Sequence, residues 1–246
     1  MDNLEEFKEL ICNGKELVVN NIQSLKEICQ SILDDPINII RYAPVLTQIK
    51  DCIKAQAPFL YPTWKFWNNV DKFFNGGMLS NEDKQKLIKK LSSDKNKNET
   101  VEKIITIIKN IDANRKMAYI LNSTKALAND RITLTEYFRI CHVIMNTLDE
   151  DLQFLKAHIH EEDLLYSVEI SGLVVSGLAY VSGFREKEVL NYSFTPIAKA
   201  VNECALIGEV NLISSFNLDE SPQTKFFATD EEFSAMLDDV FGKNVK

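Results

Sequence analysis

The densest group of potentially reactive side chains in this sequence is the hexapeptide HIHEED, which holds His158, His160, Glu161, Glu162 and Asp163. On an extended segment His158 and His160 would face the same way, because side chains alternate along a strand. Two imidazoles and a carboxylate can bind a divalent metal ion. The alternative is a solvated loop between two helices. The sequence favours the loop, so we assign no metal-binding residue.

Nucleophiles and phosphate-binding loops are the other chemistry to consider. Cys141 and Cys204 fall on apolar helix faces, where a thiol packs as a small hydrophobic group. His142 adjoins Cys141, but its place in an amphipathic helix is more typical of a boundary residue than of a general base. Residues 13–16, NGKE, lack the first glycine and the Ser/Thr of a phosphate-binding loop. We therefore predict no enzyme, no catalytic residue, no cofactor and no small-molecule ligand.

Charge and cysteine usage limit the partners and the compartment. The 246 residues carry a net charge of −8, but residues 147–246 alone hold 18 acidic and 7 basic side chains. So acidic a half repels a phosphate backbone, and we expect it to bind no nucleic acid. The five cysteines are widely spaced and form no CxxC pair, which is typical of reduced thiols and predicts a cytoplasmic location. The sequence shows no signal-peptide core and no uncharged apolar run of about 18 residues.

Helical periodicity dominates the first 160 residues, which we divide into an aromatic-rich helical segment over 1–78 and a helical middle region over 79–160. We expect helices over 4–33, 37–56, 63–74, 80–91, 101–111, 112–128, 133–148 and 149–157. Ser80, Asp112 and Asp149 are predicted N-caps, and Thr133 with Glu136 fits a capping box.

The pattern changes after residue 160, and we place a third unit at 161–213. A helix is expected over 161–171, ended by Gly172. Residues 173–175 and 178–181 are strand-like, and a second strand is expected over 190–194, followed by a helix that begins at Thr195-Pro196. This order is typical of a winged-helix-like α+β module, although a hairpin packed on a helical core is the alternative. The predicted recognition helix, EEDLLYSVEIS, has four acids and no base, so we expect protein docking rather than DNA reading.

Two surfaces are candidates for partner binding. Residues 59–74 contain seven aromatic side chains, among them Trp64 and Trp67, and could form an interface, a membrane-surface patch or simply core. Residues 214–246 read as an acidic linker and an amphipathic helix. Its apolar stripe is Phe233, Met236, Leu237, Val240 and Phe241. Such a stripe needs cover from its own domain or from a partner groove.

The middle region resembles an Abi-alpha-like group of bacterial and prophage proteins linked to abortive infection. The resemblance is carried by Val101 to Leu155, with MAYILNSTKALAND and ITLTEYFRICHVIMNTLDEDLQFL, and by the downstream GLV…YSFTPIA. It implies helical domains followed by a winged-helix-like end in a phage-defence or prophage setting. It implies no catalytic residue.

The predicted fold is mainly α, with a multi-helix domain, a winged-helix-like module and a C-terminal amphipathic helix. The predicted function is a non-enzymatic protein-interaction component of a bacterial or phage conflict system, with a protein partner or self-association. One alternative is a membrane-active abortive-infection effector that acts through residues 59–74, although a membrane surface is the less favoured partner. The other is a transcription regulator.

Overall fold

The computed structural model describes residues 31–32, 34–42, 61–184 and 189–207 of the chain. Within them the protein is mainly helical with one small antiparallel sheet, which confirms the mainly α fold class. The elements in chain order are α3 (Asn38–Arg41), α5 (Tyr61–Asn75), α6 (Asn81–Ser92), α7 (Lys97–Lys109), α8 (Asn114–Ala128), α9 (Leu134–Asn146), α10 (Asp149–His158), α11 (Val168–Val175), β1 (Ala179–Phe184), β2 (Leu190–Phe194) and α12 (Pro196–Cys204). The predicted helix over 4–33, most of that over 37–56 and the stripe at 233–241 lie outside the described residues.

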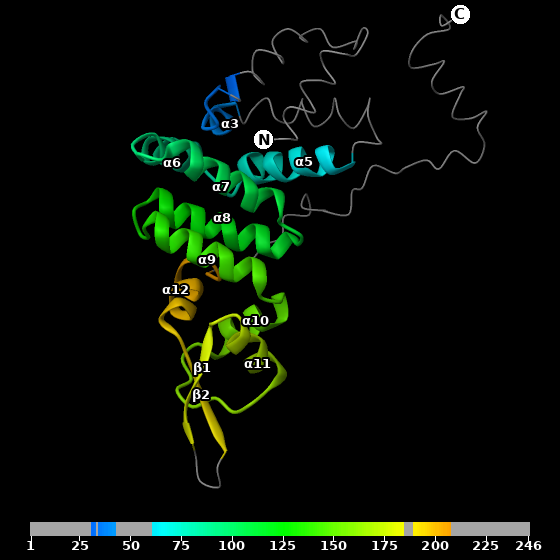
Figure 1. Ribbon diagram of the computed structural model, residues 1–246, viewed down its shortest axis with the longest axis vertical. Helices are drawn as coiled ribbons and strands as arrows, with labels where there is room; N and C mark the ends of the chain where they lie inside the picture. The colour runs from blue at the N-terminus through cyan, green and yellow to red at the C-terminus, as the bar shows by residue number, and fades with distance from the viewer. Residues whose placement is uncertain (1–30, 33, 43–60, 185–188, 208–246) are drawn as a thin grey trace, which may run out of the picture.

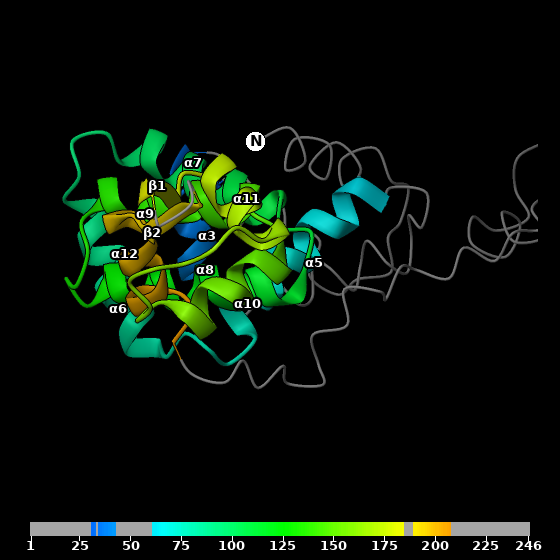
Figure 2. The same ribbon diagram turned by 90° about the horizontal axis from the view of Figure 1, so that it is seen from below.

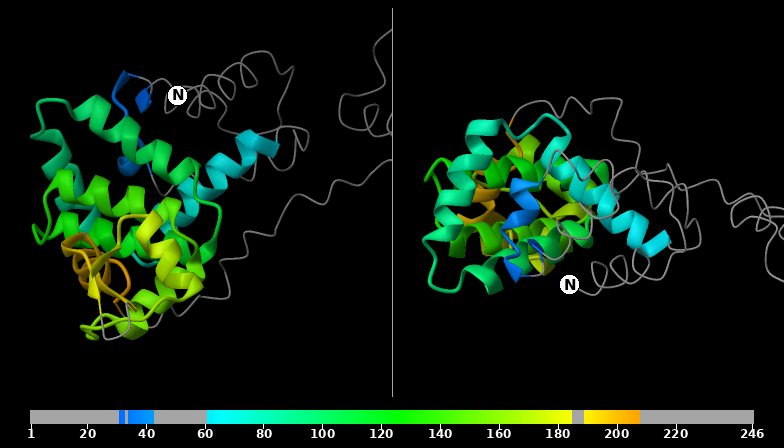
Figure 3. Two further views of the ribbon diagram at one scale, coloured as in Figure 1. Left: turned by 60° about the horizontal axis from the view of Figure 1, so that its bottom comes forward. Right: turned by 90° about the horizontal axis from the view of Figure 1, so that it is seen from above.

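The helices from α5 to α9 form stacked layers, and the hairpin of β1 and β2 projects from the opposite end of the molecule to α3 (Figure 1). The view from below looks along the hairpin toward α8 and α9 (Figure 2). With the bottom turned forward, α10, α11 and α12 surround the base of the hairpin, while the view from above has α3 and α5 nearest (Figure 3). The hairpin is therefore held at its base by the surrounding helices and projects from them.

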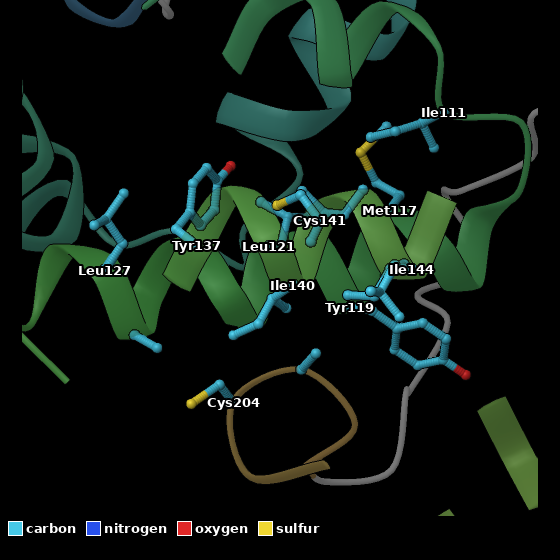
Figure 4. Packing of buried hydrophobic residues seen from close by; sticks show 14 of the residues in the cluster. Ile111, Met117, Tyr119, Leu121, Leu127, Tyr137, Ile140, Cys141, Ile144 and Cys204 are labelled. Atoms are coloured by element: carbon cyan, nitrogen blue, oxygen red, sulfur yellow. The ribbon is translucent and has the colours of Figure 1, made fainter. Parts of the chain in front are cut away.

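Helix α8 is the centre of the core, because nearly all of its circumference is buried. It packs between α6 on one side and α9 on the other. Met117 and Leu121 of α8 lie beside Cys141 of α9 in the interior, and Ile140 points away toward the turn that carries Cys204 (Figure 4). Thus α9 contributes one face to the helical layers and the other to α12.

The predicted helix starts are partly confirmed. Ser80 and Thr133 each form a capping box, with Asp83 and Glu136 respectively. The predicted cap at Asp112 is wrong, because α8 begins one residue later than Asp112 would require and Ala113 occupies the N-cap without a side-chain bond.

Asp149 is also not a cap, since it is the first residue of α10 and its carboxylate is engaged elsewhere. Arg115 donates to Asp149 Oδ2 at 2.7 Å, and Tyr119 donates to Asp149 Oδ1 at 3.2 Å. This acid therefore joins α10 to α8 instead of starting its own helix.

The predicted helix over 161–171 is wrong. Helix α11 begins only at Val168, with Ser167 as its N-cap, and Leu164 pairs with Tyr192 of β2 through two backbone hydrogen bonds. The backbone N–H and C=O of Leu164 therefore bond to β2 and not to residues four positions away, as they would in a helix. Residues 173–175, predicted as strand from their branched side chains, are the last turn of α11, since tertiary context overrides β propensity.

Gly172 does not end this helix but lies inside it. A Cβ there would lie 2.1 Å from Asp151 Oδ2, so any larger residue at this position requires the Asp151 side chain to move. The stop is Gly177, whose φ of +77° suits glycine. Gly177 N–H donates to Val174, and Leu178 N–H donates to Leu173, which together form a Schellman motif.

The two predicted strands are confirmed in kind. β2 has the predicted bounds, whereas β1 starts at Ala179 and extends beyond the predicted end to Phe184. Ala179 pairs with Phe194 and Val181 pairs with Tyr192, and a bulge follows before Gly183. α12 begins at Pro196 after the N-cap Thr195, as predicted.

The described part of the aromatic segment belongs to the core. Phe66, Trp67, Phe73 and Phe74 of α5 are buried, and Trp67 has no exposed surface. The partner-binding assignment of Trp67 is therefore corrected, because a fully buried indole leaves nothing for a partner to contact. The side chain of Trp64 lies outside the described residues.

Candidate protein-docking surface

The hairpin module, defined here as residues 149–207, is fastened to the helical layers by polar contacts from α8. Asn122 Nδ2 donates to the carbonyl of Ala205 at 2.9 Å and to that of Ile207 at 3.3 Å. The bond of Arg115 to Asp149 fixes α10, and Gln153 donates to Tyr119 beside it. Any surface on the module is therefore presented by a fixed base.

One side of the hairpin carries a row of apolar side chains, which we call the hairpin face. Val181 and Tyr192 are paired across the strands, and so are Phe184 and Leu190, so each pair shares a side of the sheet. Leu190 and Tyr192 are two residues apart on β2 and lie on the same side. The ring of Tyr166 lies 6.5 Å from that of Tyr192, which extends the row to the segment before α11.

The hairpin face is buried at its base and exposed toward Phe184. Tyr192 is 7% exposed, whereas Tyr166 is 68% exposed and Phe184 is 73% exposed. Among the described residues nine of the eleven large exposed hydrophobic side chains lie between 165 and 189, on the hairpin, on the segment before α11 and on α11 itself. They are Leu165, Tyr166, Val168, Val174, Val175, Tyr180, Val181, Phe184 and Val189. Clustered apolar exposure of this kind marks interaction sites, whereas scattered single residues do not.

The other side of the hairpin borders an open hollow of about 570 Å³, which we call the acidic hollow. Tyr180 and Ser193 form one wall from the strands, and Ser193 Oγ donates to the carbonyl of Glu162 at 3.2 Å. Glu161, Glu162 and Glu203 line the hollow together with one lysine, Lys199 of α12. Its described lining thus combines an aromatic wall with an excess of carboxylates.

The described residues of the module hold eight Asp or Glu and two Lys. The acids that had been assigned to a recognition helix, Glu161 to Asp163, lie instead in the linker before α11, and that helix keeps only Glu169. The described part of the module remains strongly acidic, and we still expect it to repel a phosphate backbone. The predicted preference for protein over DNA therefore rests on the acidity of the whole module and not on the charge of a recognition helix.

The HIHEED residues do not gather as expected for an extended segment. His158 is the last residue of α10, where its ring stacks on Phe154 at 4.2 Å and its Nδ1 lies 2.6 Å from Glu161 Oε1. His160 follows in the linker and lines the acidic hollow. Among the described residues, no three His, Cys, Asp or Glu side chains lie close enough together to hold a metal ion.

The two described thiols are buried. Burial raises the pKa of Cys141 to about 12, and burial also raises the pKa of Cys204. A thiol is nucleophilic as the thiolate, so neither group is activated. His142 is on the exposed side of α9 and contacts Asn146 of the same helix.

The predicted partner-binding stripe, Phe233 to Phe241, lies outside the described residues and stays a prediction. Sequence reasoning missed Tyr166 and Phe184 as surface residues. The available signal was the alternation in AYVSGF and LNYSF, which places Phe184 on the side of Val181 only when the bulge is known. No pattern in the sequence predicted that bulge.

Comparison with known proteins gives no match to a family model, to a curated protein or to a solved structure. In the part of the chain that the structure describes, no helix has the length and apolar character needed to cross a membrane.

Proposed function

We propose that this chain is a non-enzymatic, cytoplasmic protein-interaction component of a bacterial or phage conflict system, and that it docks a partner through the hairpin module. The observation that carries the docking role is the concentration of exposed apolar side chains on the hairpin and on the neighbouring residues 165–175. Aromatic side chains such as Tyr166 and Phe184 are the residue types that contribute most at protein interfaces.

We further propose that the module is of the winged-helix type. Support comes from the order of α10, the Leu164 bridge, α11, β1 and β2, in which Leu164 adds a third strand position beside β2. The setting in a conflict system rests on the sequence resemblance over Val101 to Leu155 alone. The two parts of the proposal therefore need separate tests.

Two substitutions test the docking role. Phe184→Asp places a charge at the exposed outer end of the hairpin face, and Leu148→Asp is the matched control, since Leu148 is 66% exposed at the N-cap of α10. We expect Phe184→Asp to melt like the wild type, and Leu148→Asp to melt no lower, because aspartate is a favoured N-cap residue. Only Phe184→Asp should abolish stoichiometric complex formation in the host cell, measured by cross-linking and size-exclusion chromatography. Equal complex formation by both variants contradicts the role.

The conflict setting is tested by phage challenge of bacteria that express the chain. We expect a change in plating efficiency of about tenfold or more, and we expect Phe184→Asp to remove it while Leu148→Asp does not. An unchanged efficiency across the phages of the native host would contradict the setting and leave the docking role intact.

A further inference from the structure

We infer that the partner of the hairpin module is a basic polypeptide segment, which lays apolar side chains on the hairpin face and inserts a Lys or Arg side chain into the acidic hollow. This inference rests on the proposed docking function and adds the chemistry of the partner.

The apolar part of the segment follows from the hairpin face. Val181, Phe184 and Leu190 form a row on one side of the strands, and Tyr166 extends that row. The face therefore offers contact to aliphatic or aromatic side chains at Val181 and Phe184, in the outer part of the hairpin that projects from the helices (Figure 1).

The cationic part follows from the acidic hollow. Three carboxylates, those of Glu161, Glu162 and Glu203, line the hollow against a single lysine ammonium from Lys199. Tyr180 adds an aromatic wall that is 49% exposed. Guanidinium and ammonium groups bind both to carboxylates and over aromatic rings, so a cationic side chain matches both features of this lining.

The hairpin face and the acidic hollow lie on opposite sides of the same strand, β1, so they are close to each other. Tyr180 and Val181 are neighbours on β1, and neighbouring side chains alternate between the sides of a sheet. The register agrees, since Tyr180 pairs with Ser193 at the hollow and Val181 pairs with Tyr192 on the hairpin face. One segment that crosses β1 can reach both.

The negative charge of the module argues against other partners for the hairpin face and the acidic hollow. A second copy of the module would bring its own excess of carboxylates to the interface. Residues 230–239 of the chain contain five acids and no base. The C-terminal apolar stripe would therefore bring more negative charge to a module that is already negative. Nucleic acid and anionic lipid are repelled for the same reason. A basic polypeptide is the occupant whose charge complements the module.

The test is a selection from a display library of random peptides of about 12 residues on the full-length protein at about 0.1 M salt, where exposed charges still interact over about 10 Å. We expect enrichment of peptides that combine two or more Lys or Arg with aliphatic or aromatic residues. An individual selected peptide should bind the Phe184→Asp variant about tenfold more weakly or worse, and the Leu148→Asp variant like the wild type.

The charge requirement has its own matched pair of variants. Glu161→Gln, Glu162→Gln and Glu203→Gln together neutralise the hollow, and Glu82→Gln, Glu102→Gln and Glu150→Gln make the same change in net charge elsewhere. We expect about a tenfold loss of affinity in the first variant only. Circular dichroism verifies the fold of each, and Glu203→Gln alone, on the exposed side of α12, serves should the triple variant melt early.

The outcomes separate the two proposals. Enriched peptides that are acidic or uncharged, but still require Phe184, overturn the basic partner and leave the docking function standing. An equal loss in both charge variants overturns the role of the hollow. No enrichment at all, or binding that Phe184→Asp leaves unchanged, overturns the docking function and the inference with it.

Discussion

At the residue scale, Asp151 is the most consequential buried charge in the hairpin module. It lies in the first turn of α10 with its carboxylate against Gly172 of α11, and the structure shows it no hydrogen-bond partner among the described residues. Loss of hydration raises the pKa of this carboxyl, and the negative charges of Glu169 and Glu150 raise it further. An ionised Asp151 therefore costs the module stability.

This cost predicts a pH dependence. The folded protein holds the Asp151 proton more tightly than the unfolded chain does, so stability falls as the pH rises through the raised pKa. We expect Asp151→Asn to raise the melting temperature at pH 7. The gain should disappear when the pH falls below the ordinary Asp value of 3.8, where both states are protonated. Glu102→Gln, on the exposed side of α7, should leave the pH profile unchanged, and an equal gain from it would refute the assignment.

Gly172 provides a second prediction at this scale. Ala is favoured over Gly inside a helix by about 1 kcal/mol, but the added methyl would meet the Asp151 carboxylate at 2.1 Å. We expect Gly172→Ala to destabilise the protein by about 1–3 kcal/mol, as overpacked sites do. Combining it with Asp151→Ala should restore stability, because the clash is gone. Urea unfolding of the four proteins of this double-mutant cycle measures the coupling, and additive effects would contradict it.

At the element scale, the helices of the middle region carry their own start signals. Thr133 Oγ1 accepts from Glu136 N–H at 3.2 Å, and Glu136 Oε2 accepts from Thr133 N–H at 2.7 Å. The Glu136 carboxylate accepts hydrogen bonds from the backbone N–H and from the hydroxyl of Thr133. These two hydrogen bonds lower the pKa of the Glu136 carboxyl. This reciprocal pair satisfies two backbone N–H groups at the start of α9.

Removing this cap gives a defined prediction. Thr133→Ala should lower the free energy of unfolding by about 1 kcal/mol, since the Glu136 N–H at the start of α9 loses its side-chain acceptor. Thr135→Ala, two residues into α9 and exposed, is the control and should be close to neutral. Thermal melting of the two variants makes the comparison, and equal losses would mean that the cap contributes nothing measurable.

At the scale of the whole molecule, the charge asymmetry decides which macromolecules can approach the hairpin. The winged-helix type proposed for the module often reads DNA, but the described residues of the module carry eight carboxylates and two lysine ammonium groups. We expect no mobility shift of duplex DNA at about 50 mM salt and micromolar protein. A shift that weakens steeply with added salt would contradict this, because it would require a cationic surface.

The sequence by itself determined the fold class, the starts of α6 and α9, the bounds of β2 and the start of α12. These features depend on contacts between residues three or four positions apart, or on strict alternation, so a short window contains the cause. The same windows predicted the overall acidity of the hairpin module and the absence of an activated thiol at Cys141.

Only the tertiary structure decided residues 161–178 and the docking surface. The linker before α11 is extended because Leu164 bonds to β2, and a glycine is accommodated inside α11 at position 172 where the Asp151 side chain of α10 lies against it. Trp67 is core because α5 packs on α7, although its neighbours in sequence read equally well as a surface. In each case the decisive partner is distant in sequence, and a backbone hydrogen bond or a close approach to that partner outweighs the weak local propensity.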